Sequence, residues 1–129
     1  MEQIFELKQK KGITRPYELF TSIKKINIDY AQENLIVFYF NTKNILIKSE
    51  ILFKGGLNSC TIDPKTLFRH ALKLNANSLI IAHNHPSDNL EPSNEDKEVF
   101  KELKKCGEIL QLKVLDSIIF NKKTYYSLC

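Results

Sequence analysis

The sequence predicts an α/β fold, a three-layer α/β sandwich in which helices cover a mixed β-sheet. Two observations lead to this prediction. Short strand patterns alternate with helix patterns along the chain, and an almost wholly apolar run at 78–82 has the pattern of a strand covered on both faces. With 129 residues, 43% of them hydrophobic, the chain can bury a full core without disulfides or a structural metal. We therefore expect one domain over residues 1–129.

In chain order, each predicted element has its own signal. The elements are a short strand at 4–7, a helix beginning near Thr14 and Pro16, strands at 34–41 and 45–53, a helix at 64–74, a strand at 78–82, a helix at 93–106, and strands at 112–120 and 124–128. Proline suits the first turn of a helix. The apolar side of the first helix consists of Leu19, Phe20, Ile23 and Ile26. β-Branched and aromatic residues mark the strand at 34–41, and a polar turn separates it from the next strand.

The two longer helices are marked by capping residues and by apolar faces. Asp63 is predicted to cap the helix at 64–74, with Pro64 at its first position. Its buried face is predicted to consist of Leu67, Phe68, Ala71 and Leu72. Ser93 and Asp96 have the Ser-x-x-Asp spacing of a capping pair, and Gly107 permits the helix that follows to stop. The apolar residues of that helix, at helical intervals, are Val99, Phe100, Leu103, Cys106 and Leu110.

Two histidines follow the apolar strand at 78–82. His83 leaves the end of that strand and His85 lies two residues on, so both imidazoles can point to the same side of an extended chain. Pro86 disfavours a helical conformation at His85 and keeps the exit extended. A polar loop can then return Asp96, in the first turn of the next helix, toward the histidines.

These three side chains are the candidate metal ligands. Two neutral imidazoles and one carboxylate suit Zn²⁺ and leave a fourth tetrahedral position for water. Taken singly, His-x-His is also typical of a turn, and Ser-x-x-Asp of a plain helix cap. Their joint occurrence at fixed offsets favours a catalytic metal site made by His83, His85 and Asp96.

The motif at 83–96 resembles that of a known family. His-x-His-Pro, six residues, Ser, two residues, Asp is the motif of the JAMM metalloproteases, or MPN+ domains, and His-Asn-His-Pro-Ser is similar to the RadC branch of that superfamily. Further stretches that resemble RadC sequences lie at 33–37, 53–58, 63–71, 115–116 and 126–128. The resemblance implies the MPN, or cytidine-deaminase-like, architecture. It implies one domain of RadC type, here without the helix-hairpin-helix segment that precedes it in fuller members.

The resemblance also implies the chemistry. Glu33 matches a family glutamate that acts as general base on water, and Ser93 matches a serine whose hydroxyl steadies the tetrahedral oxyanion. From the residues alone, Glu33 would be a solvated carboxylate at the start of a strand. The expected function is zinc-dependent hydrolysis of a peptide or isopeptide bond, in a protein or peptide substrate and without a covalent intermediate.

At three positions the sequence departs from the usual RadC pattern. Asp88 stands where glycine is usual, Phe100 where threonine is common, and Ser117 where histidine is usual. Asp88 adds negative charge beside the expected cation but lacks the conformational freedom of glycine. Ser117 removes an imidazole that could tune the site through its ligands.

The composition bears on compartment and on competing chemistries. Cys60, Cys106 and Cys129 are widely spaced, which favours a reducing cytoplasm over a disulfide framework. His70, predicted on the helix at 64–74, is assigned to packing, so a cysteine-protease arrangement is disfavoured. No run approaches the roughly 18 apolar residues of a membrane span, and the N-terminus has no leader pattern. We expect a cytoplasmic chain that contacts no membrane.

A net charge of +4 raises the alternative of a nucleic-acid partner. Lysines are spread over several elements, a pattern that ordinary solvated lysines explain. The RadC family is, however, associated by name with DNA repair. The alternative is therefore a noncatalytic, metal-containing MPN module, a protein- or DNA-associated factor in DNA repair or mobile-element biology. The intact ligand set and Glu33 favour the hydrolase.

Overall fold

The computed structural model describes residues 16–55 and 62–129. The elements are α1 (Pro16–Ile23), β1 (Glu33–Phe40), β2 (Leu46–Gly55), α2 (Pro64–Lys73), β3 (Ser78–Asn84), α3 (Asn94–Leu110), β4 (Lys113–Phe120) and β5 (Tyr125–Ser127). Apart from the end of α3, the bounds that can be compared agree with the predicted ones to within two residues. The strand predicted at 4–7 and the helix start near Thr14 lie outside the described residues.

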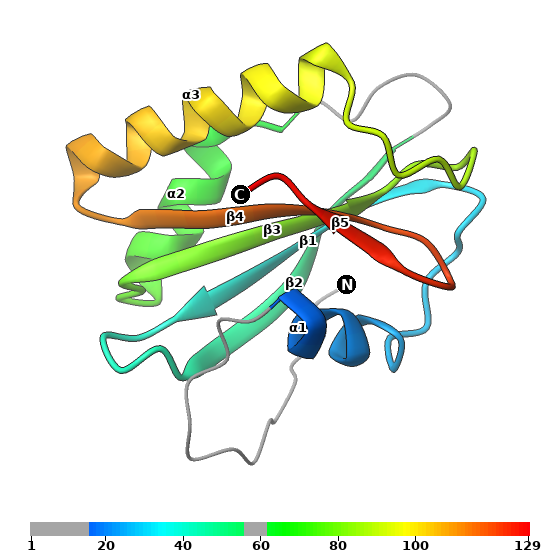
Figure 1. Ribbon diagram of the computed structural model, residues 1–129. Helices are drawn as coiled ribbons and strands as arrows, with labels where there is room; N and C mark the ends of the chain where they lie inside the picture. The colour runs from blue at the N-terminus through cyan, green and yellow to red at the C-terminus, as the bar shows by residue number, and fades with distance from the viewer. Residues whose placement is uncertain (1–15, 56–61) are drawn as a thin grey trace.

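The strands form one mixed sheet in the order β2-β1-β3-β4-β5. Strand β1 runs antiparallel to both of its neighbours, β3 and β4 are parallel, and β5 closes the edge antiparallel to β4. Figure 1 shows α2 and α3 on one face of the sheet and α1 on the other. The predicted three-layer α/β sandwich is confirmed.

Each face of the sheet carries its own apolar core, because successive side chains of a strand point to opposite faces. On β1, Leu35 and Val37 join the core beneath α2 and α3, whereas Ile36 and Phe38 join the core against α1. All four are buried. The predicted apolar side of the first helix is confirmed for Leu19, Phe20 and Ile23, which belong to the core against α1. Ile26 belongs to the same core but lies three residues beyond the end of α1, not on the helix as predicted.

Helices α2 and α3 each have one apolar residue that the sequence analysis assigned to the buried face but that the structure exposes. Leu72 on α2 is 52% exposed and Leu110 on α3 is 42% exposed. Leu72 lies between Ala71 and Leu74, which both pack in the core beneath α2 and α3, so it occupies a different side of the helix. Leu110 is the last residue of α3, beyond Phe100, Leu103 and Cys106, which pack in that core. Within the described segments, no helix is both long and apolar enough to cross a membrane.

The end of α3 differs from the prediction that Gly107 stops the helix. The helix continues to Leu110 and is capped by Gln111 in the left-handed conformation, with φ 56°. Gly107 is needed for a close approach instead, because a Cβ at this position would lie 2.3 Å from the carbonyl oxygen of Leu112. The glycine lets the chain fold back tightly from α3 into β4.

Candidate metal centre

Strand alternation places His83 on the face of the sheet that α2 and α3 cover. Leu79 and Ile81 of β3 belong to the core beneath α2 and α3, so His83, two residues further on, faces the same side. In the antiparallel pairing of β1 with β3, His83 lies opposite Leu35. Glu33 shares the face of Leu35, and both line the cavity that His83 also lines. The sheet therefore directs a carboxylate and an imidazole from two neighbouring strands into one space.

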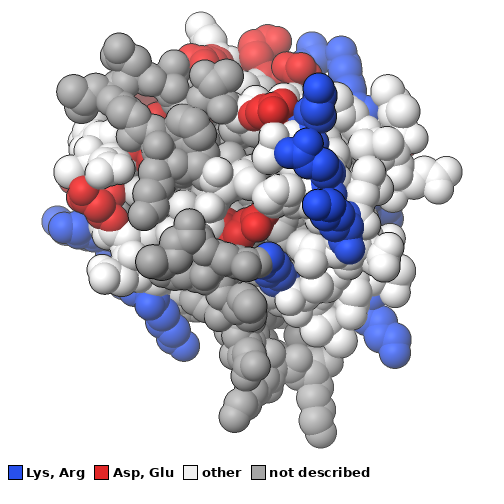
Figure 2. All heavy atoms as spheres, turned by 180° about the vertical axis from the view of Figure 1, so that it is seen from behind, with Lys and Arg blue, Asp and Glu red and all other residues white. Residues whose placement is uncertain are grey.

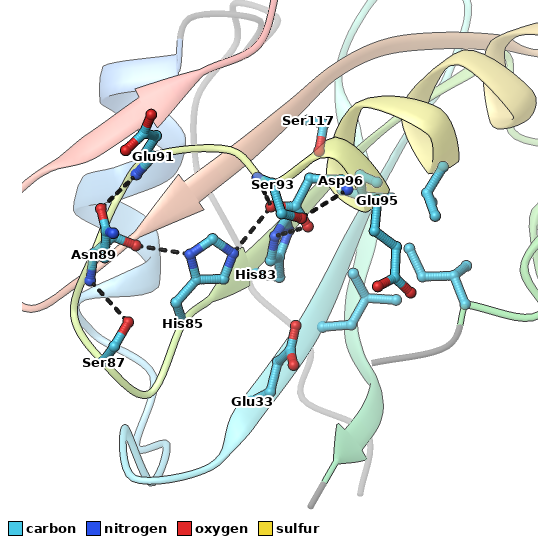
Figure 3. A pocket seen from close by; sticks show the side chains of 14 residues that line it. Glu33, His83, His85, Ser87, Asn89, Glu91, Ser93, Glu95, Asp96 and Ser117 are labelled. Carbon is cyan, nitrogen blue, oxygen red and sulfur yellow. Dashed lines mark hydrogen bonds and ion pairs between the residues drawn. The ribbon is translucent and has the colours of Figure 1, made fainter. Parts of the chain in front are cut away.

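A capping box holds Asp96 at the start of α3. The Ser93 hydroxyl accepts a hydrogen bond from the Asp96 amide at 3.0 Å, and the Ser93 amide donates to Asp96 Oδ2 at 2.8 Å. These reciprocal bonds fix the carboxylate at the end of a helix. Because α3 begins beside the end of β3, the fixed carboxylate faces the histidines (Figure 3).

The predicted ligands come together in space. His83 Nε2 lies 3.1 Å from Asp96 Oδ1, and His85 Nε2 lies 3.1 Å from Asp96 Oδ2. One potential ligand atom from each of the three residues lies within 4.8 Å of the other two. In the described part of the chain, this is the only such group of histidine, cysteine or acidic side chains. It could hold a metal ion.

A backbone carbonyl fixes the orientation of His85. The Nδ1 atom of His85 lies 2.7 Å from the carbonyl oxygen of Asn89, and a carbonyl can only accept a hydrogen bond. Nδ1 therefore carries a hydrogen, and Nε2 is the nitrogen that faces the ligand cluster. In the neutral ring Nε2 presents a lone pair, which is the form a metal ion binds.

The charges in the cluster shift two pKa values. The hydrogen bond to Asp96 raises the pKa of His85 above its ordinary value of 6.5, and burial opposes this shift. Burial also acts against ionisation of Asp96, but the hydrogen bonds from His83 and His85 outweigh it and hold the pKa of that carboxyl well below its usual range. An ionised carboxylate beside two imidazoles fits a divalent cation, which would replace the shared protons.

The three residues line a cavity of about 330 Å³. Figure 3 shows the carboxylate of Glu33 directed from β1 toward the histidine pair. Ser93, Glu95 and Ser117 also line the cavity, together with an apolar wall formed by Leu35, Ile62, Ile81 and Val99. The residues predicted as ligands, base and oxyanion donor thus border one space.

The comparisons with known proteins agree with this arrangement. A family model described as the RadC-like JAB domain matches residues 13–129. The chain belongs to the RadC family. This family is part of the JAB/MPN superfamily, as the motif at 83–96 led us to expect.

Among the relatives of this RadC-like domain are several UPF0758 proteins. That of Staphylococcus haemolyticus is 41% identical over 123 residues, covering 95% of this chain and 54% of the relative. That of Chlorobium chlorochromatii is 42% identical over 99 residues, covering 77% of this chain and 45% of the relative. A Staphylococcus aureus protein is 36% identical, covering 99% of this chain and 63% of the relative. The chain spans about half the length of the first two relatives.

Two parts of the RadC-like site were missed by the sequence analysis. Asn84 points to the other face of the sheet, where its side chain accepts a hydrogen bond from the Asn34 amide at 2.8 Å and donates to the Gln32 carbonyl at 2.8 Å. These bonds tie the end of β3 to the start of β1, and so position Glu33. The signal for it was a polar residue at the end of a mostly apolar strand, pointing to the side opposite His83. The carbonyl of Asn89 has no sequence signal, because every residue has one.

The other titratable candidates lie apart from the site. His70 contacts Glu50, with Nδ1 2.7 Å from Oε1, and Tyr39 donates to the same oxygen at 2.7 Å. Cys106 is half-buried and Cys129 is exposed, while Cys60 lies outside the described residues. Neither His70 nor the two described cysteines line the cavity of the RadC-like site.

The three departures from the RadC pattern take different places. Asp88 adopts φ 65°, a left-handed conformation that glycine would adopt without strain, and it is not among the described lining residues of the cavity. Phe100 is buried in the core beneath α2 and α3. Ser117 is buried and lines the cavity, so of the three it is the one placed to influence a ligand.

Proposed function

We propose that this chain is a zinc-dependent hydrolase of the JAMM type, which cleaves a peptide or isopeptide bond. The observation that carries the proposal is the convergence of His83, His85 and Asp96 beside a cavity into which Glu33 points. Membership of the JAB/MPN superfamily supports the same reading. Folding alone does not require two imidazoles and a carboxylate to face one another.

The donor set favours zinc among the common divalent ions. Two imidazole nitrogens and one carboxylate oxygen are of borderline hardness, and three protein ligands leave one tetrahedral position open. A zinc ion held there would polarise a carbonyl oxygen and lower the pKa of water. Asn89 would keep His85 in the ligating tautomer through its contact with Nδ1.

In this mechanism, Glu33 moves the proton. Its carboxylate accepts a proton from the attacking water as the water oxygen forms a bond to the carbonyl carbon. It then returns that proton to the amide nitrogen as the C–N bond breaks, so that an acid and an amine leave. One group acts as base and then as acid, and no covalent bond to the protein forms.

In the same mechanism, Ser93 stabilises the developing oxyanion. Its hydroxyl oxygen accepts a hydrogen bond from the Asp96 amide. A hydroxyl that accepts one hydrogen bond still has its own hydrogen to donate. Ser93 lines the same cavity as the ligand cluster, so this hydrogen could be donated to a substrate bound there. A donor fixed in this way stabilises charge in the transition state without reorganising.

The proposal is tested by metal content followed by turnover. The wild type should hold about one zinc ion per chain and cleave members of a broad peptide and isopeptide library. Glu33→Gln should keep the zinc and lose turnover by at least about 100-fold, the range of general base catalysis. A wild type that holds zinc but cleaves nothing in the library would end the hydrolase proposal.

A second candidate, a noncatalytic module that binds DNA, is favoured by one surface feature. Lys65, Arg69 and Lys73 are exposed and follow one another at four-residue intervals along α2. Figure 2 shows a row of basic side chains on the face that carries this helix. If this row contacts phosphates, duplex DNA should bind with an affinity that falls steeply with salt, and the triple change to Glu should abolish binding. Equal binding by the triple variant would exclude this candidate.

A further inference from the structure

The cavity beside the metal ligands is strongly acidic. Four carboxylates line it, from Glu33, Glu91, Glu95 and Asp96, and its described lining contains no lysine or arginine. A divalent cation would neutralise only two of these charges. The cavity therefore stays negative even when the site is loaded, although the chain as a whole is positive at +4. A cleft lined by charges of one sign attracts ligands of the other sign.

Of the four carboxylates, only that of Glu95 is directed into the cavity and lacks a role. Asp96 binds the histidines and Glu33 is the proposed base. Figure 3 shows the carboxylate of Glu91 pointing away from the histidine pair, whereas Glu95 reaches from the first turn of α3 into the cavity. Neighbouring helical residues point about 100° apart, so Asp96 can face the ligands while Glu95 faces the cavity.

The remaining wall of the cavity is apolar. It is formed by Leu35 and Ile81 from the sheet, Ile62 ahead of α2, and Val99, four residues after Glu95 on α3. Residues four apart on a helix lie on the same face, so Glu95 and Val99 present a carboxylate and an apolar surface side by side. Lysine and arginine side chains have the matching shape, an apolar stem with a cationic end.

We infer that the cavity takes a peptide with a lysine or arginine side chain beside the scissile amide, and that Glu95 determines this specificity. The inference rests on the proposed function, because it names the substrate class of the same site. The stem of the basic side chain lies along Val99 and Ile62, and its cation pairs with the Glu95 carboxylate. Selection by charge then acts apart from the chemistry of Glu33.

The test measures binding without turnover. All proteins carry Glu33→Gln and are loaded with zinc, and their zinc content is measured. The probes are three fluorescein-labelled peptides of equal length that differ at one position, which carries lysine, norleucine or glutamate. Norleucine keeps the apolar stem and removes the charge. Fluorescence anisotropy then gives Kd for each peptide, with and without Glu95→Gln or Glu95→Lys.

The lysine peptide should bind most tightly and the glutamate peptide most weakly. Glu95→Gln should weaken binding of the lysine peptide by about fivefold, which is the contribution of a partly exposed ion pair. It should leave the affinity for the norleucine peptide unchanged. Glu95→Lys should reverse the order of the lysine and glutamate peptides. Glu98→Gln is the matched control, because Glu98 is exposed on the same helix and is not among the described lining residues. It should change none of the three affinities.

Several outcomes would overturn the inference. These are equal binding of the lysine and norleucine peptides, an equal loss for all three peptides with Glu95→Gln, or no measurable binding of any peptide. Failure of the hydrolase proposal gives a different result. If zinc-loaded wild type cleaves no peptide but the order of affinities holds, the specificity stands and the catalysis fails. If it cleaves all three peptides at one rate, the catalysis stands and the specificity fails.

Discussion

His83 and His70 form a natural pair for testing the metal centre at the residue scale. Each lies within hydrogen-bond distance of a carboxylate, but only His83 belongs to the three-residue cluster. We expect His83→Ala to weaken zinc binding by more than about 100-fold, since loss of groups that merely orient the ligands already costs 10–100-fold. His70→Ala should retain full zinc content. The measurement is elemental analysis after dialysis against a competing chelator, and loss of zinc from both variants would contradict the assignment.

The pH dependence of the stability of the metal-free chain also follows from single residues. His85 has a pKa raised above 6.5 by Asp96, so in the metal-free chain its pair with Asp96 stabilises the fold fully below pH 6.5. That stabilisation is lost as pH rises through the raised pKa of His85. The lowered pKa of Asp96 has the opposite sign, giving stability above pH 3.8 that is lost as pH falls through the lowered value.

Bound zinc should reverse the loss of stability that accompanies deprotonation of His85. The ion needs the neutral Nε2 of His85, so its affinity rises as His85 loses its proton. The difference in melting temperature between zinc-loaded and metal-free protein should therefore widen between about pH 5 and pH 8. Calorimetry on both forms across this range measures it. A constant difference would mean that His85 does not compete between proton and metal.

At the residue scale, the sequence predicted side chains better than it predicted backbone partners. The grouping of His83, His85 and Asp96 followed from strand alternation and from a capping pair, which are local rules. The contact of Asn89 with His85 depends on the path of the loop at 85–93, which no local rule specifies. The role of Asn84 depends on its pairing with a segment 50 residues away in the chain.

At the element scale, the close approach at Gly107 of α3 leads to a testable prediction. Alanine is a better helix former by about 1 kcal/mol, but its Cβ would lie 2.3 Å from the Leu112 carbonyl oxygen, which is backbone and can move little. We expect Gly107→Ala to lower the free energy of unfolding by about 1–3 kcal/mol, as for other overpacked sites. Urea denaturation measures this change. Glu108→Ala, at the neighbouring exposed position, should change stability by less than about 0.5 kcal/mol, and an equal effect would contradict the steric account.

The same position explains an error in reading α3. A glycine near the end of a helical pattern ordinarily marks its stop, because glycine tolerates the left-handed conformation. Here Gln111 adopts that conformation, and Gly107 serves a close approach between α3 and the chain that enters β4. The distinction depends on tertiary contact, so the sequence pattern could not supply it.

At the scale of the whole molecule, the fold should not depend on the metal. Two apolar cores, one on each face of the sheet, hold the described elements together without the ligand cluster. Removal of zinc with a chelator should therefore leave the far-ultraviolet circular dichroism spectrum unchanged. It should lower the melting temperature by about 10 °C relative to protein with zinc at 100 times its Kd, which corresponds to about 2.7 kcal/mol. Unfolding on chelation would show that the ion is structural instead.

The whole architecture was predictable in part. Alternating elements and an apolar central strand predicted the layers, because a sheet buried on both faces needs helices on both. The strand order was not predicted, since it depends on which strands pair across long stretches of chain. Exposure of Leu72 and Leu110 was likewise missed, because periodicity gives neither the exact width of the buried face of a helix nor the point at which the helix leaves the core.

Because β1 pairs with β3, the number of residues between Glu33 and Leu35 determines which face of the sheet Glu33 occupies. One extra amino acid inserted between positions 33 and 35 would turn this carboxylate to the opposite side of the sheet, toward α1, while the pairing of Leu35 with His83 stayed intact. Two extra amino acids would restore the side but carry the carboxylate about 7 Å further along the strand. Either insertion should leave a folded protein with an intact ligand cluster but without the proposed base, so we expect natural length changes in this domain to fall elsewhere.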